Sequence, residues 1–408
     1  MLAFILLARD SKRRHNTGLA AWHENMKRTY AILIIALATT ALTAAGEGFV
    51  SIFNGRDLTG WTNVNCAPES WSVRDGVIHC TGHPTGALRT TRQYENFILE
   101  LEWRHLTSGG NSGIFIWASP IAAPGVPFLR GIEVQVLDHG FNVPGKNEWY
   151  TTHGDVFPIH GATMEPFGRH NGQRSFPSEE RSKGTPEWNH YRIVCTNGVL
   201  RLQVNGKEVS GGRECNYRKG FLGLESEGAP VEFRNLQIRE LPESGAAPEV
   251  AAPQDPGWQS LFTGMDFRGW NTNAALLSRW SVQGERIALL DAPEAGKATL
   301  WTEAQFADAE FVVDCLPAKP APGLDRGTPS VQVRGRNGQG VAVKLEGAEP
   351  GRWQRFFITV AGADVRVMCN GHETHSLKLP ADGPQRGAFG LADTGGPVQI
   401  MNVYARGL

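Results

Sequence analysis

The chain has 408 residues, of which 40 are basic and 41 are acidic, and its formal net charge is −1. This balance argues against a nucleic-acid-binding surface, which would need a basic excess. The length is enough for two domains of ordinary size. The sequence holds 48 glycines and 12 tryptophans. Because hairpin turns use glycine and strands favour aromatic residues, this composition indicates an all-β protein.

The N-terminal segment predicts export. A short basic stretch at 26–28 precedes an apolar run over 30–41, and small residues at 43–45 suit cleavage. We therefore expect an upstream extension plus signal peptide over 1–45, with the natural start at Met26 and a secreted or periplasmic location. The alternative is an uncleaved membrane anchor. The apolar run is too short for a comfortable span, so no stable membrane insertion is expected.

The rest of the sequence is a tandem duplication. WQSLFTGMDFRGW repeats the pattern of GFVSIFNGRDLTGW at an offset of 209 residues, which aligns Trp61 with Trp270. Later matches align Trp188 with Trp353 at an offset of 165. Self-similarity of this kind predicts two copies of one domain. The predicted parts are a first domain over 46–241, a Pro/Ala-rich linker over 242–256 and a second domain over 257–408.

The second copy is shorter than the first. Trp103 and Trp188 are 85 residues apart, whereas Cys315, the rough counterpart of Trp103, and Trp353 are 38 apart, so about 47 residues are missing. The missing part includes most of 139–187 and any counterpart of Glu133. We therefore expect the second copy to bind or pack and not to catalyse. Packing of the two copies as one rigid unit is a further alternative.

Each copy consists of short strands separated by turns. Asn-Gly pairs at 197–198 and 205–206 are strong hairpin signals. Many short strands with such turns predict two tandem antiparallel β-sandwich domains of the jelly-roll type. Six cysteines follow the signal segment, and Cys66–Cys80 and Cys195–Cys215 are candidate disulfides in an exported chain. No zinc-like spacing is present.

Residues 97–138 hold most of the candidate site. Strict alternation predicts strands at 97–104 and 131–138, and the glycine-rich turn GGNSG between them allows close approach of backbone or ligand. The alternative to a site is a solvated sheet face with surface ion pairs. The polar side chains expected to share one face are Glu102, Arg104, Asn111, Glu133 and Gln135.

Residues 139–187 show no clear periodicity, and a loop of this length in a compact domain is usually functional or disordered. It contains four of the 12 histidines. One interpretation is a divalent metal site formed by His153, Asp155 and His160. The alternatives are histidines that bond backbone carbonyls, and His153 or His160 acting as a proton carrier. No other cofactor is expected.

Glu225 and Glu227 lie on one face of a predicted strand in GLESEGAP. We predict that Glu225 joins the polar face and binds substrate. For Glu227, an edge strand protected by charge is an equally good explanation. Aromatic rings stack on the apolar faces of pyranoses, and carboxylates and amides bind hydroxyls, so this residue set is typical of a carbohydrate site.

These segments together resemble the 3-keto-disaccharide hydrolase family. SIFNGRDLTGW, GGNSGIF, GIEVQVLD and VNGKEV occur in the family's order within 48–241, while 257–408 resembles the family only at its ends. The resemblance implies a concanavalin A-like jelly roll with a concave sugar-binding face. It also implies cleavage of glycosides oxidised to a ketone at sugar carbon 3. The expected partner is an oligosaccharide or keto-glycoside, with no nucleic acid.

The resemblance also carries residues. Trp117 departs from the family pattern, because an arginine often follows the NSGIF turn, and we predict that Trp117 contacts substrate. If that arginine contacts substrate in relatives, the choice of substrate differs here. The family pattern is matched at Glu102, Arg104, Asn111, Ser112, Glu133, Gln135 and Asp138.

A ketone at C3 acidifies the hydrogen on C2, so elimination of the C1 substituent followed by hydration would give net hydrolysis. This route needs a base, a positive group near the C3 oxygen and an acid near the leaving oxygen. We assign Glu133 as the base. Arg104, or a metal bound by His153 and Asp155, would stabilise the enolate, and His153 or His160 would be the acid.

Two other functions fit the same residues. Glu102 and Glu133 could act as the carboxylate pair of an ordinary glycosidase. Both copies could instead be lectin-like modules that bind glycan without catalysis. The 139–187 segment separates these hypotheses, because an enzyme should need it and a simple binder need not.

Overall fold

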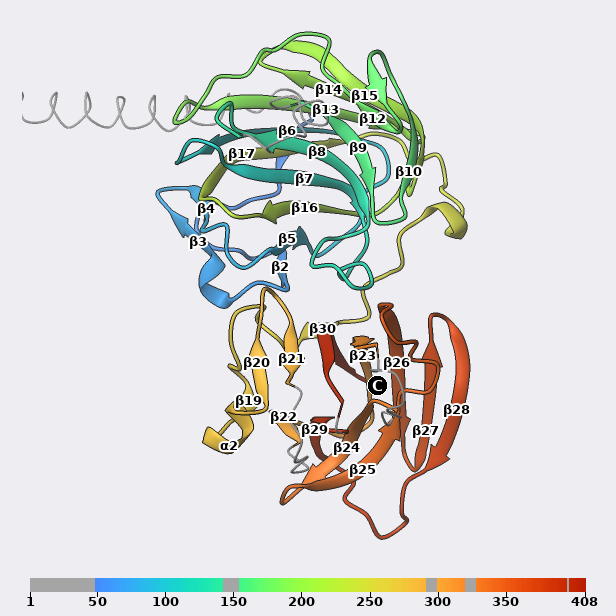
Figure 1. Cartoon of the computed structure of the whole chain (residues 1–408). Coiled ribbons are helices and arrows are strands. Elements are labelled where there is room, and N and C mark those ends of the chain that lie inside the picture. The colour runs from blue at the N-terminus through green and yellow to red at the C-terminus, as the bar shows by residue number, and fades with distance from the viewer. Residues whose placement is uncertain (1–47, 142–153, 291–298, 320–327, 395) are drawn as a thin grey trace, which may run out of the picture. The chain divides into compact units, whose positions relative to one another are not determined.

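The computed structural model describes residues 48–141, 154–290, 299–319, 328–394 and 396–408, which are almost entirely strands (Figure 1). The predicted signal segment lies outside these residues. No described helix is long and apolar enough to cross a membrane. The short helical turns are η1 (Pro68–Ser70), η2 (Pro248–Val250) and α2 (Ala274–Leu277).

The first copy forms two antiparallel sheets, called here the outer sheet and the site sheet. In hydrogen-bonding order, the outer sheet comprises β10 (Thr163–Pro166), β15 (Lys207–Asn216), β14 (Val199–Val204), β13 (Asn189–Thr196), β6 (Phe97–His105), β17 (Val231–Glu240), β4 (Val77–Cys80) and β3 (Trp71–Arg74), and β1 (Val50–Ser51) pairs with β17. The site sheet comprises β11 (His170–Asn171), β12 (Arg174–Ser175), β9 (Val156–Ile159), β8 (Gly131–Leu137), β7 (Asn111–Ala118), β16 (Phe221–Ser226), β5 (Gly86–Thr90) and β2 (Trp61–Val64).

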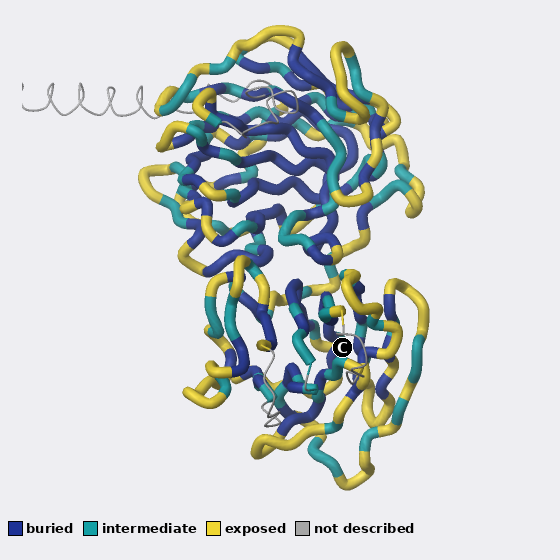
Figure 2. Tube along the Cα trace, in the orientation of Figure 1, coloured by how far each residue is buried: buried dark blue, intermediate teal, exposed yellow. Residues whose placement is uncertain are grey.

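The core of this sandwich follows from period-2 alternation. Along β6, Leu99, Leu101 and Trp103 are buried, and the Trp103 ring meets Tyr191 of β13 edge to face at 5.4 Å between centroids. Tyr191 in turn donates a hydrogen bond from its hydroxyl to the carbonyl of Gln135 on the site sheet, at 2.8 Å. Each sheet therefore buries one face against the other and leaves its second face for other contacts. Figure 2 shows the buried central strands and the exposed hairpin tips.

The predicted turns are present. The hairpins that join β13 to β14 and β14 to β15 contain Asn197 and Asn205, whose φ angles are 48° and 47°. Asparagine tolerates this left-handed conformation better than most residues, which explains why the Asn-Gly signal was informative.

The segment 139–187 is not a structureless loop. Its described part contains β9, β10, β11 and β12, and these short strands extend both sheets of the sandwich. They are two to four residues long. Alternation cannot be recognised over so few positions, which explains why no strand was predicted here.

Two further expectations change. All six cysteines are buried free thiols, so the pairings Cys66–Cys80 and Cys195–Cys215 are wrong. Burial raises the pKa of the Cys80 thiol to about 11, which keeps it protonated. The linker is not free of the first sandwich: the amide nitrogen of Ala252 donates to the carbonyl of Lys219 at 2.7 Å.

The second copy repeats the architecture with two antiparallel sheets. One comprises β20 (Trp280–Val282), β21 (Ile287–Leu289), β30 (Val398–Gly407), β23 (Ala309–Pro317), β26 (Gln354–Ala361), β27 (Asp364–Cys369) and β28 (His372–Lys378), with β18 (Gln259–Ser260) beside β30. The other, called here the platform sheet, comprises β19 (Trp270–Asn271), β22 (Leu300–Phe306), β29 (Gly387–Ala392), β24 (Ser330–Arg336) and β25 (Gln339–Lys344). The prediction of an all-β chain with two antiparallel sandwiches is confirmed.

Candidate active site

Glu102 and Arg104 do not share a face with Glu133. They lie on β6 of the outer sheet, where they point away from the core because Leu101 and Trp103 point into it. The Arg104 Nε donates to Glu232 at 2.7 Å, and the Arg104 guanidinium stacks on Trp188. Alternation assigned the correct face of each strand, but it does not reveal that consecutive strands belong to different sheets. The predicted roles of Glu102 and Arg104 at this site therefore fail on geometry.

Four of the predicted residues do come together, on the face of the site sheet that points away from the core. Gln135 pairs with Gly113, and Glu133 pairs with Phe115, so β8 presents both polar side chains on this face. Glu225 on β16 is 1% exposed and Glu133 is 6% exposed. Asn111, at the start of β7, is half-buried. Carboxylates and amides from three neighbouring strands thus form one cluster.

Gly113 creates the space in which the two carboxyl groups meet. A Cβ atom at this position would lie 2.9 Å from Glu133 Oε1 and 2.9 Å from Glu225 Oε2. The two oxygens are therefore separated by at most twice that distance, about 5.8 Å. Real Cβ atoms do not approach other atoms this closely, so any side chain at Gly113 would displace one of the carboxyl groups.

An amide chain leads from this pair to Glu227. Gln135 Nε2 donates to Asn111 Oδ1 at 2.7 Å, and Asn111 Nδ2 donates to Glu227 Oε2 at 2.5 Å. Glu227 is half-buried, so it lies at the more accessible edge of the cluster. Glu225 Oε2 is buried and, apart from the neighbouring carboxyl of Glu227, has no hydrogen-bond partner among the described residues. A bare charge there would be costly, which favours a protonated carboxyl.

Burial and mutual repulsion shift the cluster toward its protonated forms. Burial, with a smaller contribution from the charge of Glu227, raises the pKa of Glu133 to about 8. Burial and then the neighbouring charge of Glu133 raise the pKa of Glu225, and burial raises the pKa of Glu227. Near neutral pH the cluster therefore holds protons that ordinary surface glutamates would have lost, and such groups can both give and take a proton.

A positive group that the sequence did not indicate lies on the same face. Arg174 of β12 donates from Nη1 to Asp155 at 2.7 Å and lies over the Phe157 ring, 3.4 Å from its centroid. Phe157 pairs directly with Glu133 across β9 and β8. The charge of Arg174 lowers the pKa of Glu133, against the larger effect of burial. Arg174 therefore stands where we expected Arg104.

The remaining predicted residues are placed differently. Trp117 is fully buried, packs edge to face on Phe97 and donates its indole N–H to the carbonyl of Glu95 at 2.8 Å, so it belongs to the core and not to a substrate surface. His160 stacks on Phe128, and burial lowers its pKa. His153 lies outside the described residues. Among the described residues, no group of three or more His, Cys, Asp and Glu could hold a metal ion. Because the predicted set of His153, Asp155 and His160 includes a residue outside that part of the chain, the metal site stays a prediction.

Comparison with known proteins gives the family. The model of the 3-keto-α-glucoside-1,2-lyase-like domain matches residues 48–239 and again residues 257–406. The chain belongs to this family. Both copies match the 3-keto-α-glucoside-1,2-lyase-like model, which confirms the resemblance seen in the sequence and the prediction of an enzyme of the glycoside-cleaving type.

The chain is also similar to individual proteins. A Bacteroides thetaiotaomicron protein named 3-keto-disaccharide hydrolase is 24% identical over 238 residues, which is 49% of this chain and 81% of that protein. The crystal structure of a candidate glycosyl hydrolase from Parabacteroides distasonis is 22% identical, with a TM-score of 0.38, over 48% of this chain and 95% of that one. The carbohydrate-binding module CBM66 from Bacillus subtilis is 14% identical, with a TM-score of 0.32, over 44% of this chain and 96% of that one.

Strand register identifies what the second family copy carries at the same places. Gly223 and Gly390 correspond, because both follow the offset of 167 residues that also relates Asn235 to Asn402. In the first copy, Gly223 pairs with Arg89 and Phe115, and Phe115 pairs with Glu133. In the second copy, the corresponding pairs join Gly390 to Trp301 and Gln332, and Gln332 to Ala342.

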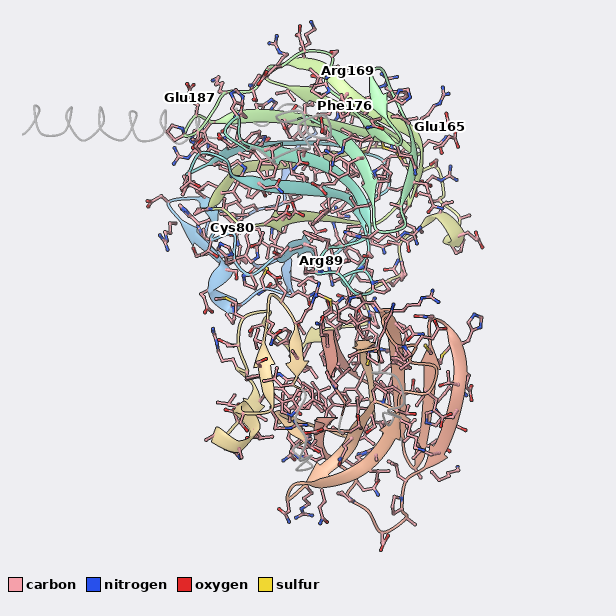
Figure 3. The ribbon with its side chains drawn as sticks, viewed as in Figure 1. Cys80, Arg89, Glu165, Arg169, Phe176 and Glu187 are labelled. Atoms are coloured by element: carbon pink, nitrogen blue, oxygen red, sulfur yellow. The ribbon has the colours of Figure 1, made fainter. Side chains whose placement is uncertain are left out.

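Glu133 is therefore replaced by Ala342 and Arg89 by Trp301. Two residues after Gly390, Ala392 stands in the place of Glu225, which follows Gly223 by two residues. The second copy therefore lacks counterparts of Glu133 and Glu225, the two most buried carboxyl groups of the cluster. Figure 3 labels Arg89, which is buried in the first sandwich, stacks on Phe221 and forms an ion pair with Asp255 of the linker segment.

Proposed function

We propose that the first sandwich cleaves the glycosidic bond of a 3-keto-disaccharide or related 3-keto-glycoside. The observation that carries the proposal is the pair of buried carboxyl groups, Glu133 and Glu225, that meet above Gly113. Two groups with raised pKa values at one place match a reaction that moves one proton off carbon and another onto oxygen.

The proposed reaction is elimination followed by hydration. A carboxylate removes the proton from C2, and the electron pair forms the enolate of the C3 ketone. The enolate reforms the ketone as the C1–C2 double bond forms and the C1–O bond breaks, and the leaving oxygen takes a proton. Water then adds its hydroxyl to C1 and its proton to C2, so the sum of the steps is hydrolysis.

We assign Glu133 as the base, because a pKa of about 8 makes its carboxylate a much stronger base than an ordinary glutamate. Glu225, whose pKa is raised further by the neighbouring charge of Glu133, is the proposed acid at the leaving oxygen. Arg174 supplies the positive charge for the enolate oxygen. Asn111 and Glu227, at the more accessible edge, are proposed to bind sugar hydroxyls.

The separation of the two carboxyl groups favours a second candidate, an ordinary retaining glycosidase. Retaining enzymes place their carboxyl groups about 5–5.5 Å apart, and inverting enzymes about 6.5–9.5 Å apart. The limit of about 5.8 Å between Glu133 Oε1 and Glu225 Oε2 is compatible only with the first class. In that reaction the carboxylate attacks C1 and never touches the hydrogen on C2.

Hydrogen exchange at C2 separates the two reactions. The purified chain is incubated in D2O with 3-keto-trehalose and with trehalose, and the released sugars are analysed by mass spectrometry and NMR. Elimination predicts release only from the keto sugar, with deuterium at C2 of the product. Release from trehalose without deuterium at C2 would establish an ordinary glycosidase instead, retaining if the first-formed anomer keeps the α configuration. Release from neither sugar would contradict both proposals.

We also propose that the protein is exported, on the basis of the pattern over 26–45. The test is to express the gene with a C-terminal tag, separate the periplasmic, membrane and secreted fractions, and determine the N-terminus by mass spectrometry. A mature chain that starts near Gly46 is expected. A full-length chain in the cytoplasm would overturn the export proposal without affecting the proposed activity.

A further inference from the structure

The platform sheet of the second sandwich carries an indole on the face that corresponds to the candidate site. Trp301 of β22 lies above backbone from three other strands. A Cβ atom built at Gly335, Gly390 or Gly340 would come within 2.1, 2.7 or 2.8 Å of the Trp301 ring. The ring therefore occupies the space that side chains at these three positions would need, and it lies flat on the backbone there. The indole is therefore held against the sheet by its supporting strands.

The outer side of the ring is accessible and its surroundings are polar. Trp301 is half-buried, as are its neighbours Gln332 and Ser330 on β24. Lys344 pairs with Ser330 and is exposed, so it belongs to the same face. None of the exposed large hydrophobic residues of the described chain lies on these strands. A stable protein interface usually presents a contiguous apolar patch. This face has a single aromatic ring among amide, hydroxyl and ammonium groups, so it does not resemble a protein interface.

A cavity lies near the start of β25. Gly340, one of the supporting glycines, also lines a cavity of about 760 Å³ that is bordered by the amides of Asn337 and Gln339. This volume is within the range that holds small ligands.

We propose that Trp301 is a stacking platform for a neutral oligosaccharide, and that the second copy binds glycan without cleaving it. The C–H groups of a pyranose face carry partial positive charge and pack on the negative face of an aromatic ring. Gln332 and Lys344 offer hydrogen bonds to the hydroxyls at the ring's rim. The loss of both carboxyl groups at Ala342 and Ala392 removes the proton chemistry of the first copy from this face. The proposal does not depend on the reaction proposed for the first copy.

The test is calorimetric titration of the full chain with cellohexaose, laminarihexaose and maltohexaose, none of which contains a keto sugar. At least one should bind and change the tryptophan fluorescence. Trp301→Ala should weaken that binding roughly tenfold or more, because it removes the stacking surface, and Trp301→Phe should restore part of it. Circular dichroism checks that each variant is folded.

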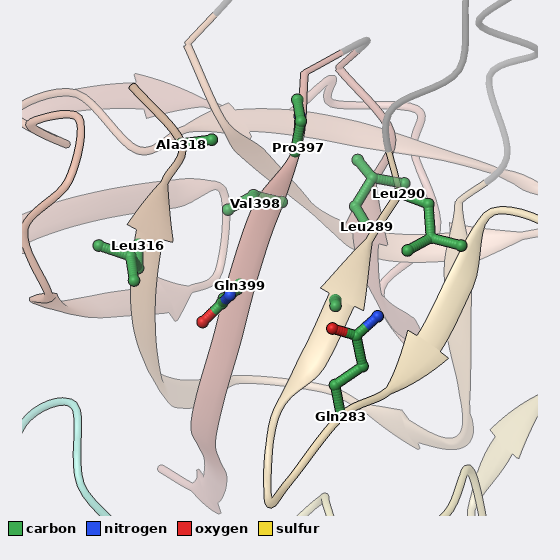
Figure 4. A pocket seen from close by; sticks show the side chains of 9 residues that line it. Gln283, Leu289, Leu290, Leu316, Ala318, Pro397, Val398 and Gln399 are labelled. Atoms are coloured by element: carbon green, nitrogen blue, oxygen red, sulfur yellow. The ribbon is translucent and has the colours of Figure 1, made fainter. Parts of the chain in front are cut away.

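Leu290→Ala is the matched control. Leu290 is an exposed apolar residue of the same sandwich, and it lines a separate pocket of about 240 Å³ with Leu289 and Leu316 (Figure 4). Its replacement should leave the dissociation constant unchanged. If Trp301→Ala does not fold, Gln332→Ala decides the question, because it borders the ring without supporting it and should weaken binding several-fold. Binding by none of the three saccharides, equal binding by wild type and Trp301→Ala, or a loss only in Leu290→Ala would overturn the proposal.

Discussion

The two sandwiches both bury mainly apolar residues between their sheets, and they differ in chemistry on one outward face. In the first copy that face buries Glu133, Glu225 and Gln135, and in the second the corresponding face carries Ala342, Ala392 and an accessible indole. Inward positions such as Leu224 and Leu391 are alike because both copies need the same core. The residues that form the core and the residues that form the candidate site lie on opposite faces of the same strands. The site residues can therefore differ between the copies while the core is conserved.

The largest effect on activity is expected when the proposed base, which only the first copy has, is removed. Glu133→Gln keeps the shape of the side chain but cannot accept a proton, so cleavage of 3-keto-trehalose should fall about 10²–10⁴-fold. Initial rates measured by chromatography of the released sugar check this. Glu102→Gln, on the other sheet, is the control and should retain nearly full activity. A Glu133→Gln variant as active as wild type would remove Glu133 from the mechanism.

The glycine beneath the carboxyl pair allows a second test. Gly113→Ala should displace Glu133 or Glu225, because its Cβ would lie 2.9 Å from both carboxyl groups. A shift of about 1 Å in a catalytic group can cost roughly 10²-fold in rate, so we expect a loss of that size in kcat/KM. Ser330, which corresponds to Gly113 in the second sandwich, supplies the comparison: Ser330→Ala should leave the rate unchanged. Full activity in Gly113→Ala would mean that the two carboxyl groups need not meet.

The raised pKa of Glu133 sharpens the assignment of its role. If its carboxylate is the base, only the deprotonated enzyme reacts, so kcat/KM should rise about tenfold per pH unit as pH approaches 8 and then level off. The measurement is a pH–rate profile with the keto substrate. A profile that falls as pH passes through this range would instead make Glu133 the acid.

The same group should make the stability of the protein depend on pH. The folded pKa of about 8 lies above the ordinary value of 4.5, so folding binds a proton and stability falls as pH rises from about 4.5 to 8. Glu133→Gln has no such proton, and its advantage over wild type should grow by about 3 kcal/mol between pH 5 and pH 8.

Urea unfolding at the two pH values measures this difference. The smallest effect is expected at Ala342, the exposed residue of the second copy that corresponds to Glu133. Ala342→Glu should change the free energy of unfolding by less than about 0.5 kcal/mol at either pH. A constant difference between Glu133→Gln and wild type across this range would show that Glu133 titrates normally.

The sequence was sufficient to predict the fold and half of the site. Period-2 alternation and the turn signals found the strands, and the repeat found the second copy. Asn111, Glu133, Gln135 and Glu225 were found because each lies on a strand long enough to show its faces. The prediction that Arg104 lies beside Glu133 was wrong, because alternation shows which face of a strand a side chain is on but not which sheet the strand belongs to.

Arg174 could not be predicted. It lies on a strand of two residues within a segment that has no periodicity, and only the strand order β12, β9, β8 brings it beside Glu133. Trp117 was misjudged for a related reason. A bulge turns its side chain inward, and a bulge leaves no mark in the alternation of residue types.

That bulge also bears on how substitutions in this family should be interpreted. Trp117 and Arg334 stand at the same point of the two copies, with φ angles of 53° and 55°, and both side chains are buried. The indole donates to the carbonyl of Glu95 and the guanidinium donates to Asp308, and these acceptors lie just before β6 and β23 of the facing sheets. Both copies therefore have a long side chain with a terminal N–H at this position, and its hydrogen bond links one sheet to the segment that precedes a strand of the other sheet. We expect that replacing Trp117 with arginine would change this hydrogen bond between the sheets and would leave the substrate specificity unchanged.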